Sequence, residues 1–399
     1  MNYHIITQDN FFDAYIEDIY KLHQEANNVF WVRGVPSATP WKQTSRKVEY
    51  LGDDASAIRS RLKSLQPEDK LFVCWYDMAI GNAILDSGIR NDVYVYVMGG
   101  EFYAEPFWYH ASWLFDPITY RYLKKGGFEG YPQVNWKRRP RNLGKVYDEI
   151  CRMRFFLRGQ EELYQQKLRG MRRINHIVLP KEARAEYEFI RRLYPGMRCK
   201  AAGGVFTQNY DDAALFPSKE GSDEGEIRIL VGNSADPSNN YYDAFYWLKK
   251  QIKKSARRVI IYSMLAYGNQ RHRDDVIQKG DELFGESFIP VTEYRSRVDY
   301  ISFLNSMDVM VMYHNRQQAV GNIMTGLTLG KPVLMKGRSP VYAMMKGQGC
   351  DSVHDVSKVA FTELDNIIQS AAQNRDGTRE VVKRIYSEER RLEYLKDLL

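Results

Sequence analysis

Two loops in the second half of the sequence combine the residue types that bind phosphate. Each follows an apolar, strand-like run, at 227–231 and 309–313, and each leads into a predicted helix. Small residues let backbone N–H groups approach a ligand, a guanidinium pairs with phosphate oxygens, and a helix N-terminus carries partial positive charge. The loops therefore predict a diphosphate cradle. Its candidate residues are Gly232, Asn233, Ser234, Arg316, Gln317, Gln318, Gly321 and Asn322.

Each loop also has a structural alternative. The first can be an ordinary strand-to-helix turn with Ser238 or Asn240 as the helix cap. In the second, Arg316 can be a surface charge beside glutamines that only fill the loop. The first loop contains neither a G-x-G-x-x-G nor a G-x-x-x-x-G-K-S/T pattern, so the sequence does not indicate a dinucleotide site or a P-loop.

Tyr267 is a further candidate for the same site. It stands beside Gly268 in the loop that follows the predicted strand at 259–262. Its ring can stack on a nucleobase or pack against a sugar. The chain contains 28 tyrosines, and a half-buried packing role for Tyr267 is the alternative interpretation.

Two carboxylates in the first half of the chain lie where predicted strands end. Glu101 follows Gly99 and Gly100 at the end of the strand at 93–98, and Asp9 follows the strand at 2–7. A carboxylate in such a place can act as a general base or orient an acceptor hydroxyl. Glu101 can instead cap the next helix or pair with a lysine. We predict both residues as catalytic candidates.

The sequence provides no pattern for a metal site. It contains no D-x-D triplet and no His, Cys, Asp and Glu cluster with ligand spacing. We therefore expect no metal and no cofactor beyond the substrate. Charge on a leaving nucleotide would be neutralised by Arg316 and by helix dipoles.

Short β-branched or aromatic runs alternate with helical patterns along the chain, which is typical of parallel α/β units. Strands are predicted at 2–7, 28–33, 70–76, 93–98 and 174–179, with helices at 12–25, 55–65, 78–87 and 182–193. Later strands are predicted at 227–231, 259–262, 288–291, 309–313 and 332–335, with helices at 240–253, 270–284, 297–306, 321–329, 339–347, 358–373 and 378–397.

The length of 399 residues exceeds what one core usually supports, so we predict two domains. The polar stretch Pro217–Gly225 interrupts the pattern like a linker. We expect an N-terminal domain at 1–217, a C-terminal domain at 226–385 and a terminal helix at 386–399. Both domains are predicted to be doubly wound and Rossmann-like, and to face a shared cleft.

Positive charge is concentrated in one region of the chain. The net charge is +7, and residues 119–173 alone contain 15 Lys and Arg against 5 Asp and Glu, so the rest is slightly acidic. This basic and aromatic stretch lies in a predicted insertion near 104–173. We expect it to contact an anionic surface such as a membrane; a solvated charged face is the alternative. Its densest cations are Lys137, Arg138, Arg139 and Arg141.

Targeting signals are absent from the sequence. The N-terminus enters strand-like sequence directly, and no run approaches 18 consecutive apolar residues. The four cysteines lie far apart, without a C-x-x-C pair, which favours reduced thiols. We therefore expect a cytoplasmic protein that does not span a membrane.

The segments ILVGNSADPSN at 229–239, RQQ-x-x-G at 316–321 with GKPVL behind it, and more weakly VMGGEFY at 97–103 resemble one known family. This is the TDP-N-acetylfucosamine:lipid II N-acetylfucosaminyltransferase family, glycosyltransferase family 56, of enterobacterial common antigen synthesis. The resemblance implies the two-domain GT-B fold. It also implies a TDP- or UDP-linked deoxyamino sugar as donor, bound by the C-terminal domain, and an undecaprenyl-diphosphate-linked glycan as acceptor. The enzyme would then be peripheral on the inner face of the cytoplasmic membrane.

Three other interpretations remain open from the sequence. A capsule or O-antigen glycosyltransferase with a different donor sugar would carry the same motifs. A nucleotide-sugar 2-epimerase shares the architecture but needs no lipid acceptor. A nucleic-acid-binding protein could use residues 119–173 as its footprint, although the acidic remainder and the lack of a known nucleic-acid module weigh against this, and we expect no nucleic-acid partner.

Overall fold

The computed structural model describes residues 1–8, 10–36, 48–52, 54–103, 114–125, 161–194, 196–205, 210–217 and 225–399. These residues form two compact units. The first contains the described residues up to 103, those of 161–205, and 388–399. The second contains 114–125 and the described residues of 210–387.

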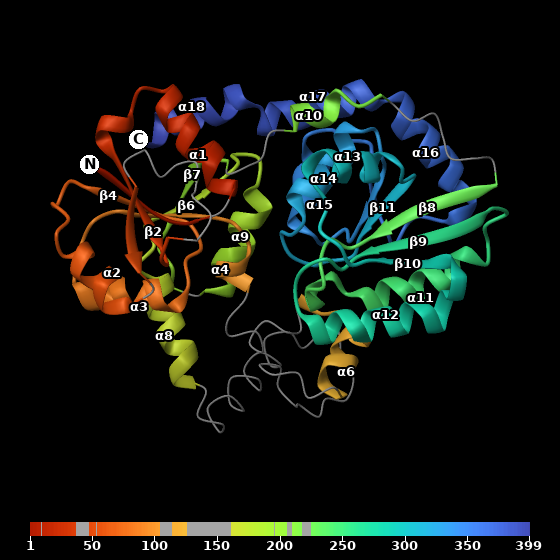
Figure 1. Ribbon diagram of the computed structural model, residues 1–399, viewed down its shortest axis with the longest axis horizontal. Helices are drawn as coiled ribbons and strands as arrows, with labels where there is room; N and C mark the ends of the chain where they lie inside the picture. Colours follow the sequence, from red (N-terminus) through yellow and green to blue (C-terminus); the bar gives the residue numbers. More distant parts are fainter. Residues whose placement is uncertain are drawn as a thin grey trace. The chain divides into compact units, whose positions relative to one another are not determined.

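The first unit is built on a parallel sheet of seven strands in the order β3-β2-β1-β4-β5-β6-β7, counted over the described residues (Figure 1). The strands are β1 Asn2–Thr7, β2 Asn28–Arg33, β3 Val48–Gly52, β4 Lys70–Val73, β5 Val93–Tyr96, β6 His176–Leu179 and β7 Lys200–Gly203. The helices are α1 Asn10–Lys21, α2 Ala55–Leu62, α3 Met78–Ser87, α4 Gly100–Tyr103, α8 Glu161–Met171, α9 Arg184–Leu193 and α18 Glu388–Leu398, with the 3-10 turn η1 Glu25–Asn27.

The second unit is built on a parallel sheet of six strands in the order β10-β9-β8-β11-β12-β13, within the described part of the chain. The strands are β8 Glu226–Val231, β9 Arg258–Met264, β10 Phe288–Val291, β11 Val309–Met312, β12 Val333–Met335 and β13 Val353–Asp355. The helices are α6 Pro117–Lys125, α10 Asp211–Ala214, α11 Tyr241–Ile252, α12 Gln270–Phe284, α13 Arg297–Asn305, α14 Val320–Thr328, α15 Pro340–Gly347, α16 Leu364–Gln373 and α17 Arg375–Tyr386, with the 3-10 turns η2 Pro237–Asn239, η3 Gly285–Ser287 and η4 Phe361–Glu363.

The central strands form because their side chains are buried on both faces of a sheet that helices cover. All four residues of β11, for example, are buried, as expected for a parallel strand with a continuous apolar run. The predicted fold class of two doubly wound α/β sheets is therefore confirmed. The second sheet carries its own core, which includes Ile229, Val231, Phe245 and Val311.

The C-terminal helix α18 belongs to the first unit. Arg391 on α18 forms an ion pair of 2.9 Å with Asp18 on α1, and both side chains are at most 5% exposed. Leu395 and Leu398 pack into the core of that unit. The prediction of one helix over 378–397 is wrong. The structure has two helices there, because Ser387 adopts an extended conformation (ψ 159°) between the end of α17 and the start of α18.

Helix α6 packs on the second unit, although the sequence placed it in the N-terminal domain. The ring of Tyr122 stacks on that of Tyr242 with centroids 3.8 Å apart. The carboxylate of Asp243 on α11 accepts hydrogen bonds from the backbone N–H groups of Ile118 (3.1 Å) and Thr119 (2.7 Å). These contacts join residues at least 120 positions apart in the sequence, so a prediction that follows consecutive elements misses them.

The N-terminal boundary of the second unit also differs from the predicted linker at Pro217–Gly225. Arg379 donates to the carbonyl of Ala214 at 3.0 Å, and Arg375 donates to that of Phe216 at 2.6 Å. Both arginines lie on α17, so they hold residues 210–217 against the second unit. The chain therefore enters this unit before residue 210.

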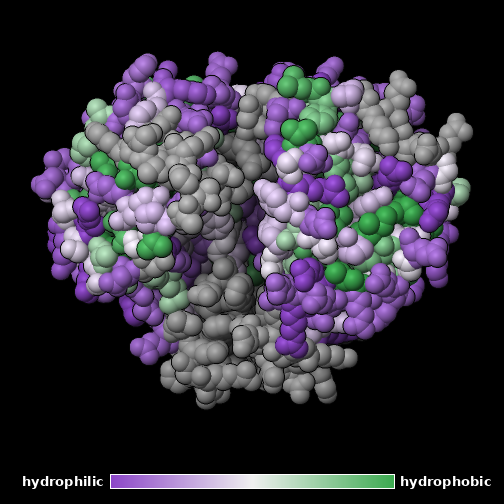
Figure 2. All heavy atoms as spheres, viewed as in Figure 1, coloured by the Kyte–Doolittle hydropathy of each residue, from purple (hydrophilic) through white to green (hydrophobic). Residues whose placement is uncertain are grey.

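Hydrophilic side chains cover most of the described surface on the face in Figure 2, with apolar residues in scattered groups. Among the described helices, none combines the length and the apolarity that a bilayer span requires.

Candidate functional site

The second unit has a topological switch point between β8 and β11. These neighbouring strands pair with Val231 opposite Val311, and the connections leave them toward opposite sides of the sheet. In doubly wound sheets, ligands bind at the carboxyl ends of the strands beside such a point. The loops that start at Gly232 and Tyr313 are therefore the natural walls of a ligand site.

The loop after β8 is held in one conformation by buried packing and polar contacts. Gly232 has a φ of 68°, and a Cβ there would collide with the ring and hydroxyl of Tyr241. That hydroxyl lies within hydrogen-bonding distance of the carbonyls of Met264 (2.8 Å) and Ser234 (3.1 Å), to either of which its one proton can be donated. Glycine is thus needed here both for the left-handed conformation and for the close approach.

Asn239 ties this loop together from within. Its side chain accepts from the backbone N–H of Asn233 at 3.1 Å and donates to the carbonyls of Ser234 (3.0 Å) and Asp236 (3.1 Å). The backbone N–H of Asn233 is therefore bonded within the loop, and the loop is held in a defined conformation.

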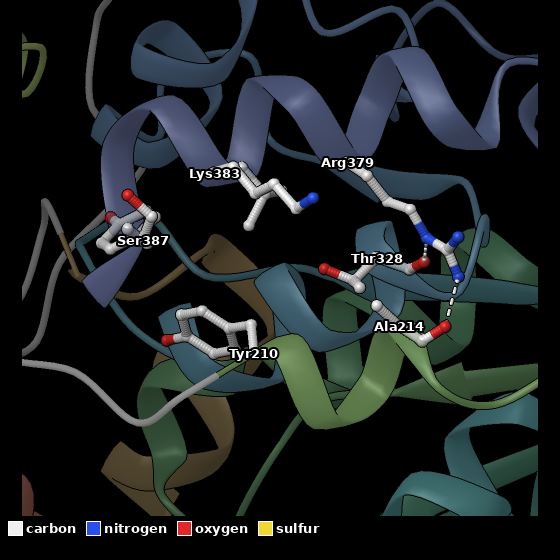
Figure 3. Close-up of a pocket in the computed structure, with 8 residues that line it drawn as sticks. Tyr210, Ala214, Thr328, Arg379, Lys383 and Ser387 are labelled. Carbon is white, nitrogen blue, oxygen red and sulfur yellow. Dashed lines mark hydrogen bonds between the residues drawn. The ribbon is translucent and has the colours of Figure 1, made fainter. Parts of the chain in front are cut away.

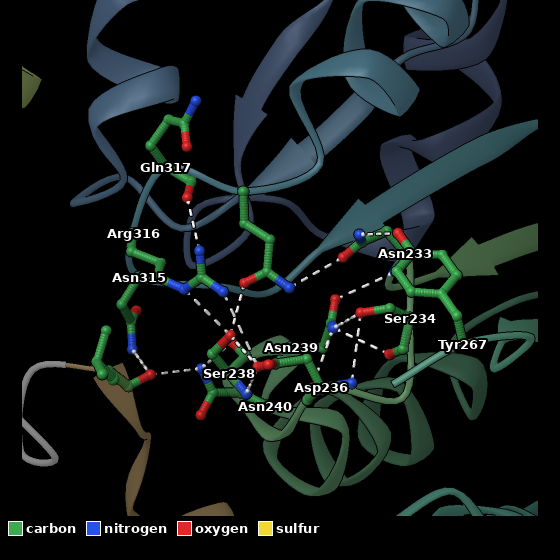
Figure 4. A network of polar contacts seen from close by, with 12 residues as sticks. Asn233, Ser234, Asp236, Ser238, Asn239, Asn240, Tyr267, Asn315, Arg316 and Gln317 are labelled. Carbon is green, nitrogen blue, oxygen red and sulfur yellow. Dashed lines mark hydrogen bonds and ion pairs between the residues drawn. The ribbon is translucent and has the colours of Figure 1, made fainter. Parts of the chain in front are cut away.

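The loop after β11 is joined to the first loop by side-chain hydrogen bonds (Figure 4). Gln318 donates from Nε2 to Oδ1 of Asn233 at 3.0 Å and accepts from the hydroxyl of Ser238 at 2.6 Å. Arg316 donates from Nε to the same hydroxyl at 3.3 Å. Tyr267 accepts from Nδ2 of Asn233 at 3.0 Å. Four predicted donor residues are thus brought into one network, with Ser238 as a member.

The other predicted donor residues lie beside this network. The carbonyl of Gln317 accepts from Arg316 at 3.0 Å. Gly321 and Asn322 form the first turn of α14, and Ser234 belongs to the first loop. The arrangement directs the positive end of a helix and a guanidinium toward the same strand ends, which suits a diphosphate.

Two residues of these loops have a strained backbone. Asn240 (φ 53°) and Ala319 (φ 57°) are both non-glycine residues in the left-handed region, and each directly precedes a helix. Strain of this kind costs about 1–3 kcal/mol per residue and is found preferentially at functional sites.

Charged and titratable groups surround the site. Arg316 is 14% exposed, and its guanidinium lies 4.0 Å from the carboxylate of Asp236. Burial, followed by the charge of Arg316, lowers the pKa of His314 to about 3, so this histidine is neutral at physiological pH. Burial raises the pKa of Tyr267, which keeps its hydroxyl protonated.

A second cationic pair follows β12, and sequence reasoning missed it. Lys336 (2.8 Å) and Arg338 both pair with Asp116, whose side chain is 5% exposed. Arg338 also donates to Asn315 at 2.7 Å, so this cluster adjoins the Arg316 loop. Two cations share one carboxylate, which leaves local positive charge. The position of Lys336 at a strand end was a usable signal, whereas Asp116 lies 220 residues away in sequence.

In the first unit, Glu101 is the second residue of α4 and is 4% exposed. Its Oε1 accepts hydrogen bonds from the backbone N–H groups of Met98 and Gly99 (3.0 Å to Gly99). The carboxylate thus accepts hydrogen bonds from the turn that precedes α4, which is the capping role that the sequence analysis gave as its alternative. Its Oε2 is buried and has no hydrogen-bond partner within the described part of the chain. Burial raises the pKa of Glu101 to about 7, against these hydrogen bonds and the charge of Lys167.

The remaining predicted residues lie outside the described part of the chain. These are the catalytic candidate Asp9 and the basic cluster Lys137, Arg138, Arg139 and Arg141. Among the described residues, no group of three or more His, Cys, Asp or Glu is arranged to hold a metal ion.

A separate small hollow lies beside α10 and α17 in the second unit (Figure 3). Arg379 donates there to the carbonyls of Thr328 (2.9 Å) and Ala214 (3.0 Å), so its guanidinium joins helices and is not available to a ligand. The hollow shares no residue with the network of Figure 4. Its lining residues are Tyr210, Ala214, Thr328, Arg379, Val382, Lys383, Tyr386 and Ser387.

The sequence matches the model of one protein family, described as 4-alpha-L-fucosyltransferase glycosyl transferase group 56, over residues 163–375. This is more than half of the chain. The matched range includes the residues of the network in Figure 4 except Leu114, whose carbonyl accepts a hydrogen bond from Asn240.

Solved structures of GT-B glycosyltransferases match the whole chain. A UDP-forming α,α-trehalose-phosphate synthase from Burkholderia vietnamiensis is 10% identical (TM-score 0.59, covering 100% of this chain and 99% of that one). The E. coli trehalose-6-phosphate enzyme bound with UDP-2-fluoro glucose is 7% identical (TM-score 0.61, 100% and 98%). A glycosyltransferase from Rickettsia africae ESF-5 is 9% identical (TM-score 0.58, 100% and 97%). At these identities the likeness concerns the fold, and it confirms the GT-B prediction.

Proposed function

This chain belongs to glycosyltransferase family 56, and from that premise we propose that it transfers a deoxyamino sugar such as N-acetylfucosamine from a nucleotide sugar to a polyprenyl-diphosphate-linked glycan. The observation that carries the proposal is the network of Arg316, Gln318, Ser238 and Asn233 at the switch point of the second unit. A fucose-type sugar agrees with the α-L-fucosyltransferase description of the family model.

We place the donor diphosphate between residues 232–234 and 316–321. The guanidinium of Arg316 and the N-terminus of α14 would neutralise the leaving nucleotide. Tyr267 is 59% exposed, and its hydroxyl is held by Asn233, so its ring can stack on the base or the sugar of a TDP- or UDP-linked donor.

The second candidate within enzymes is a capsule or O-antigen glycosyltransferase with another donor sugar. It would carry the same motifs, because residues that bind phosphate do not determine which sugar is transferred. A nucleotide-sugar 2-epimerase is the third, and it would convert the donor without any acceptor. Acceptor-dependent release of nucleoside diphosphate separates the transferases from the epimerase.

A melting-temperature screen of nucleotide sugars tests the donor assignment. Ligand present at 100 times its Kd stabilises the native state by about 2.7 kcal/mol. We expect TDP- or UDP-linked deoxyamino sugars to raise the Tm more than the corresponding nucleoside monophosphates, because only the former fill the diphosphate site. Lys383→Ala, in the separate hollow, should leave the shift unchanged. The absence of any shift with every nucleotide sugar would remove the donor proposal.

Metal independence is a second expectation. The sequence contains no D-x-D triplet, and Arg316, Lys336 and Arg338 supply fixed positive charge near the proposed diphosphate. We expect sugar transfer to continue undiminished in EDTA, measured as release of nucleoside diphosphate. Complete loss of activity that Mg²⁺ restores would contradict this expectation.

We also propose that the basic cluster Lys137, Arg138, Arg139 and Arg141 holds the enzyme on an anionic membrane or on the diphosphate of its acceptor. Each cation near such a surface contributes on the order of 1 kcal/mol. We expect co-sedimentation with anionic liposomes at low salt, and its loss when the four residues are changed to glutamine. The matched control neutralises four exposed cations of the α11 region, Lys249, Lys250, Lys253 and Lys254.

The liposome experiment has two outcomes that oppose the membrane proposal. One is the absence of binding by the wild type at low salt, where electrostatic attraction is strongest. The other is equal binding by the quadruple variant of the basic cluster and by the α11 control.

A further inference from the structure

The first unit has a switch point of its own, between β1 and β4. The strand order β3-β2-β1-β4-β5 means that the chain winds to opposite sides from these two neighbours, which pair in parallel through Ile5 and Val73. By the same rule that located the donor loops, the carboxyl ends of β1 and β4 border a ligand site. Trp75 is the second residue after β4.

The backbone of Trp75 is strained. Its φ of 61° lies in the left-handed region, where a bulky side chain is a rare occupant. The indole is 37% exposed, whereas the neighbouring Cys74 and Tyr76 are 1% exposed. A residue that served only the core would need neither the strained conformation nor the exposure, so the conformation serves to present the ring at this edge.

The indole of Trp75 packs against Gly100, which has no side chain. A Cβ at Gly100 would lie 3.2 Å from Cζ3 of Trp75, which is closer than ordinary packing permits. The glycine at the start of α4 therefore lets the ring lie against the turn after β5 while part of it remains exposed. The predicted catalytic residue Glu101 is the next residue along the chain.

A charged pair joins the end of β2 to a residue two positions after Trp75 in the chain. Arg33, the last residue of β2, forms an ion pair of 2.8 Å with Asp77, and Asp77 caps α3 through the N–H of Ile80 at 2.9 Å. The ion pair joins the end of β2 to the loop that carries Trp75. Asp77 remains 48% exposed, so it can still bind a hydroxyl group.

We propose that Trp75 is the platform on which a sugar ring of the acceptor stacks. A pyranose presents an apolar face of C–H groups, which an exposed indole plane covers, and its hydroxyls at the ring edge suit a carboxylate and guanidinium pair. The occupant is thus a saccharide of the acceptor glycan. The assignment rests on the proposed function for the existence of a glycan acceptor, but it can be tested without catalysis.

Two variants at position 75 separate the ring from the backbone. Trp75→Asn removes the aromatic plane but tolerates the left-handed conformation, so its Tm should not fall. Trp75→Phe keeps an aromatic plane. The probe is an array of free oligosaccharides that contain N-acetylhexosamines, read as direct binding, together with calorimetric titration of the nucleotide sugar.

We expect Trp75→Asn to weaken saccharide binding roughly tenfold or more and Trp75→Phe to retain most of it, while both bind the donor like the wild type. In transfer assays, Trp75→Asn should raise the KM for the acceptor. The rate at which the enzyme hydrolyses the donor when no acceptor is present should stay unchanged. Undiminished saccharide binding by Trp75→Asn overturns the platform, and so does a wild type that binds no saccharide. Failure of the proposed function is a different result, namely that the wild type binds no nucleotide sugar.

Discussion

Glu101→Gln is expected to lower the rate of sugar transfer by about 10²–10⁴-fold, the contribution of a general base, while donor affinity stays nearly intact. Glu101 lies at a strand end in the unit that we propose for the acceptor, and its Oε2 has no partner among the described residues. Glutamine keeps an oxygen for the N–H groups of Met98 and Gly99 but cannot accept a proton. The measurement is steady-state turnover together with calorimetric donor titration.

The pH dependence distinguishes a base from a structural cap. Burial raises the pKa of Glu101 to about 7, and only the ionised form can accept a proton, so kcat/KM should fall as the pH drops below about 7. The residual activity of Glu101→Gln should lack this decline. Glu186→Gln is the matched control, because Glu186 is a second buried carboxylate of the same unit, bonded to the hydroxyl of Tyr103.

The same pKa has a consequence for stability. Glu101 binds its proton more tightly in the folded state, with a pKa of about 7, than at its ordinary value of 4.5. The free energy of unfolding should therefore fall as the pH rises from about 4.5 through 7, and Glu101→Gln should remove that part of the dependence.

Near-normal turnover in Glu101→Gln, together with loss of turnover in Asp9→Asn, would transfer the catalytic role to Asp9.

Arg316→Ala is expected to weaken nucleotide-sugar binding by roughly 1.5–3 kcal/mol, the scale of a hydrogen bond to a charged group. The guanidinium is held by Ser238 and by the carbonyl of Gln317, so it is pre-oriented at the strand ends. Arg316→Lys should recover only part of the affinity, because an ammonium lacks the planar fork that matches phosphate oxygens. Calorimetric titration with the nucleotide sugar measures both changes.

The control for this prediction lies on the same sheet. Arg228 forms an ion pair of 2.9 Å with Glu226 near the amino end of β8, away from the carboxyl ends where the ligand is proposed to bind. Arg228→Ala should leave donor affinity unchanged. Equal affinities of wild type and Arg316→Ala would exclude Arg316 from the donor site.

Most of the long strands could be predicted from sequence, because parallel strands buried on both faces are continuous apolar runs. The predicted strand at 288–291 and the helices at 78–87 and 270–284 have the bounds that the structure shows. Three strands were missed, namely β3, β7 and β13. All three lie at the edges of the described sheets. The two shorter ones, β7 (KAAG) and β13 (VHD), lack the apolar pattern of a central strand.

The fold class, the family and the two loops of the proposed donor site follow from the sequence alone. Each loop follows a strong apolar strand, and parallel strands necessarily place their carboxyl ends at one edge. Which side chains complete the proposed sites depends on tertiary contacts. Asp116 joins Lys336 and Arg338 from far away in sequence, and Trp75 is distinguished by its backbone conformation and by its fit against Gly100. Such contacts depend on which strand ends become neighbours and on how the backbone turns after them, and a local pattern of residues contains neither.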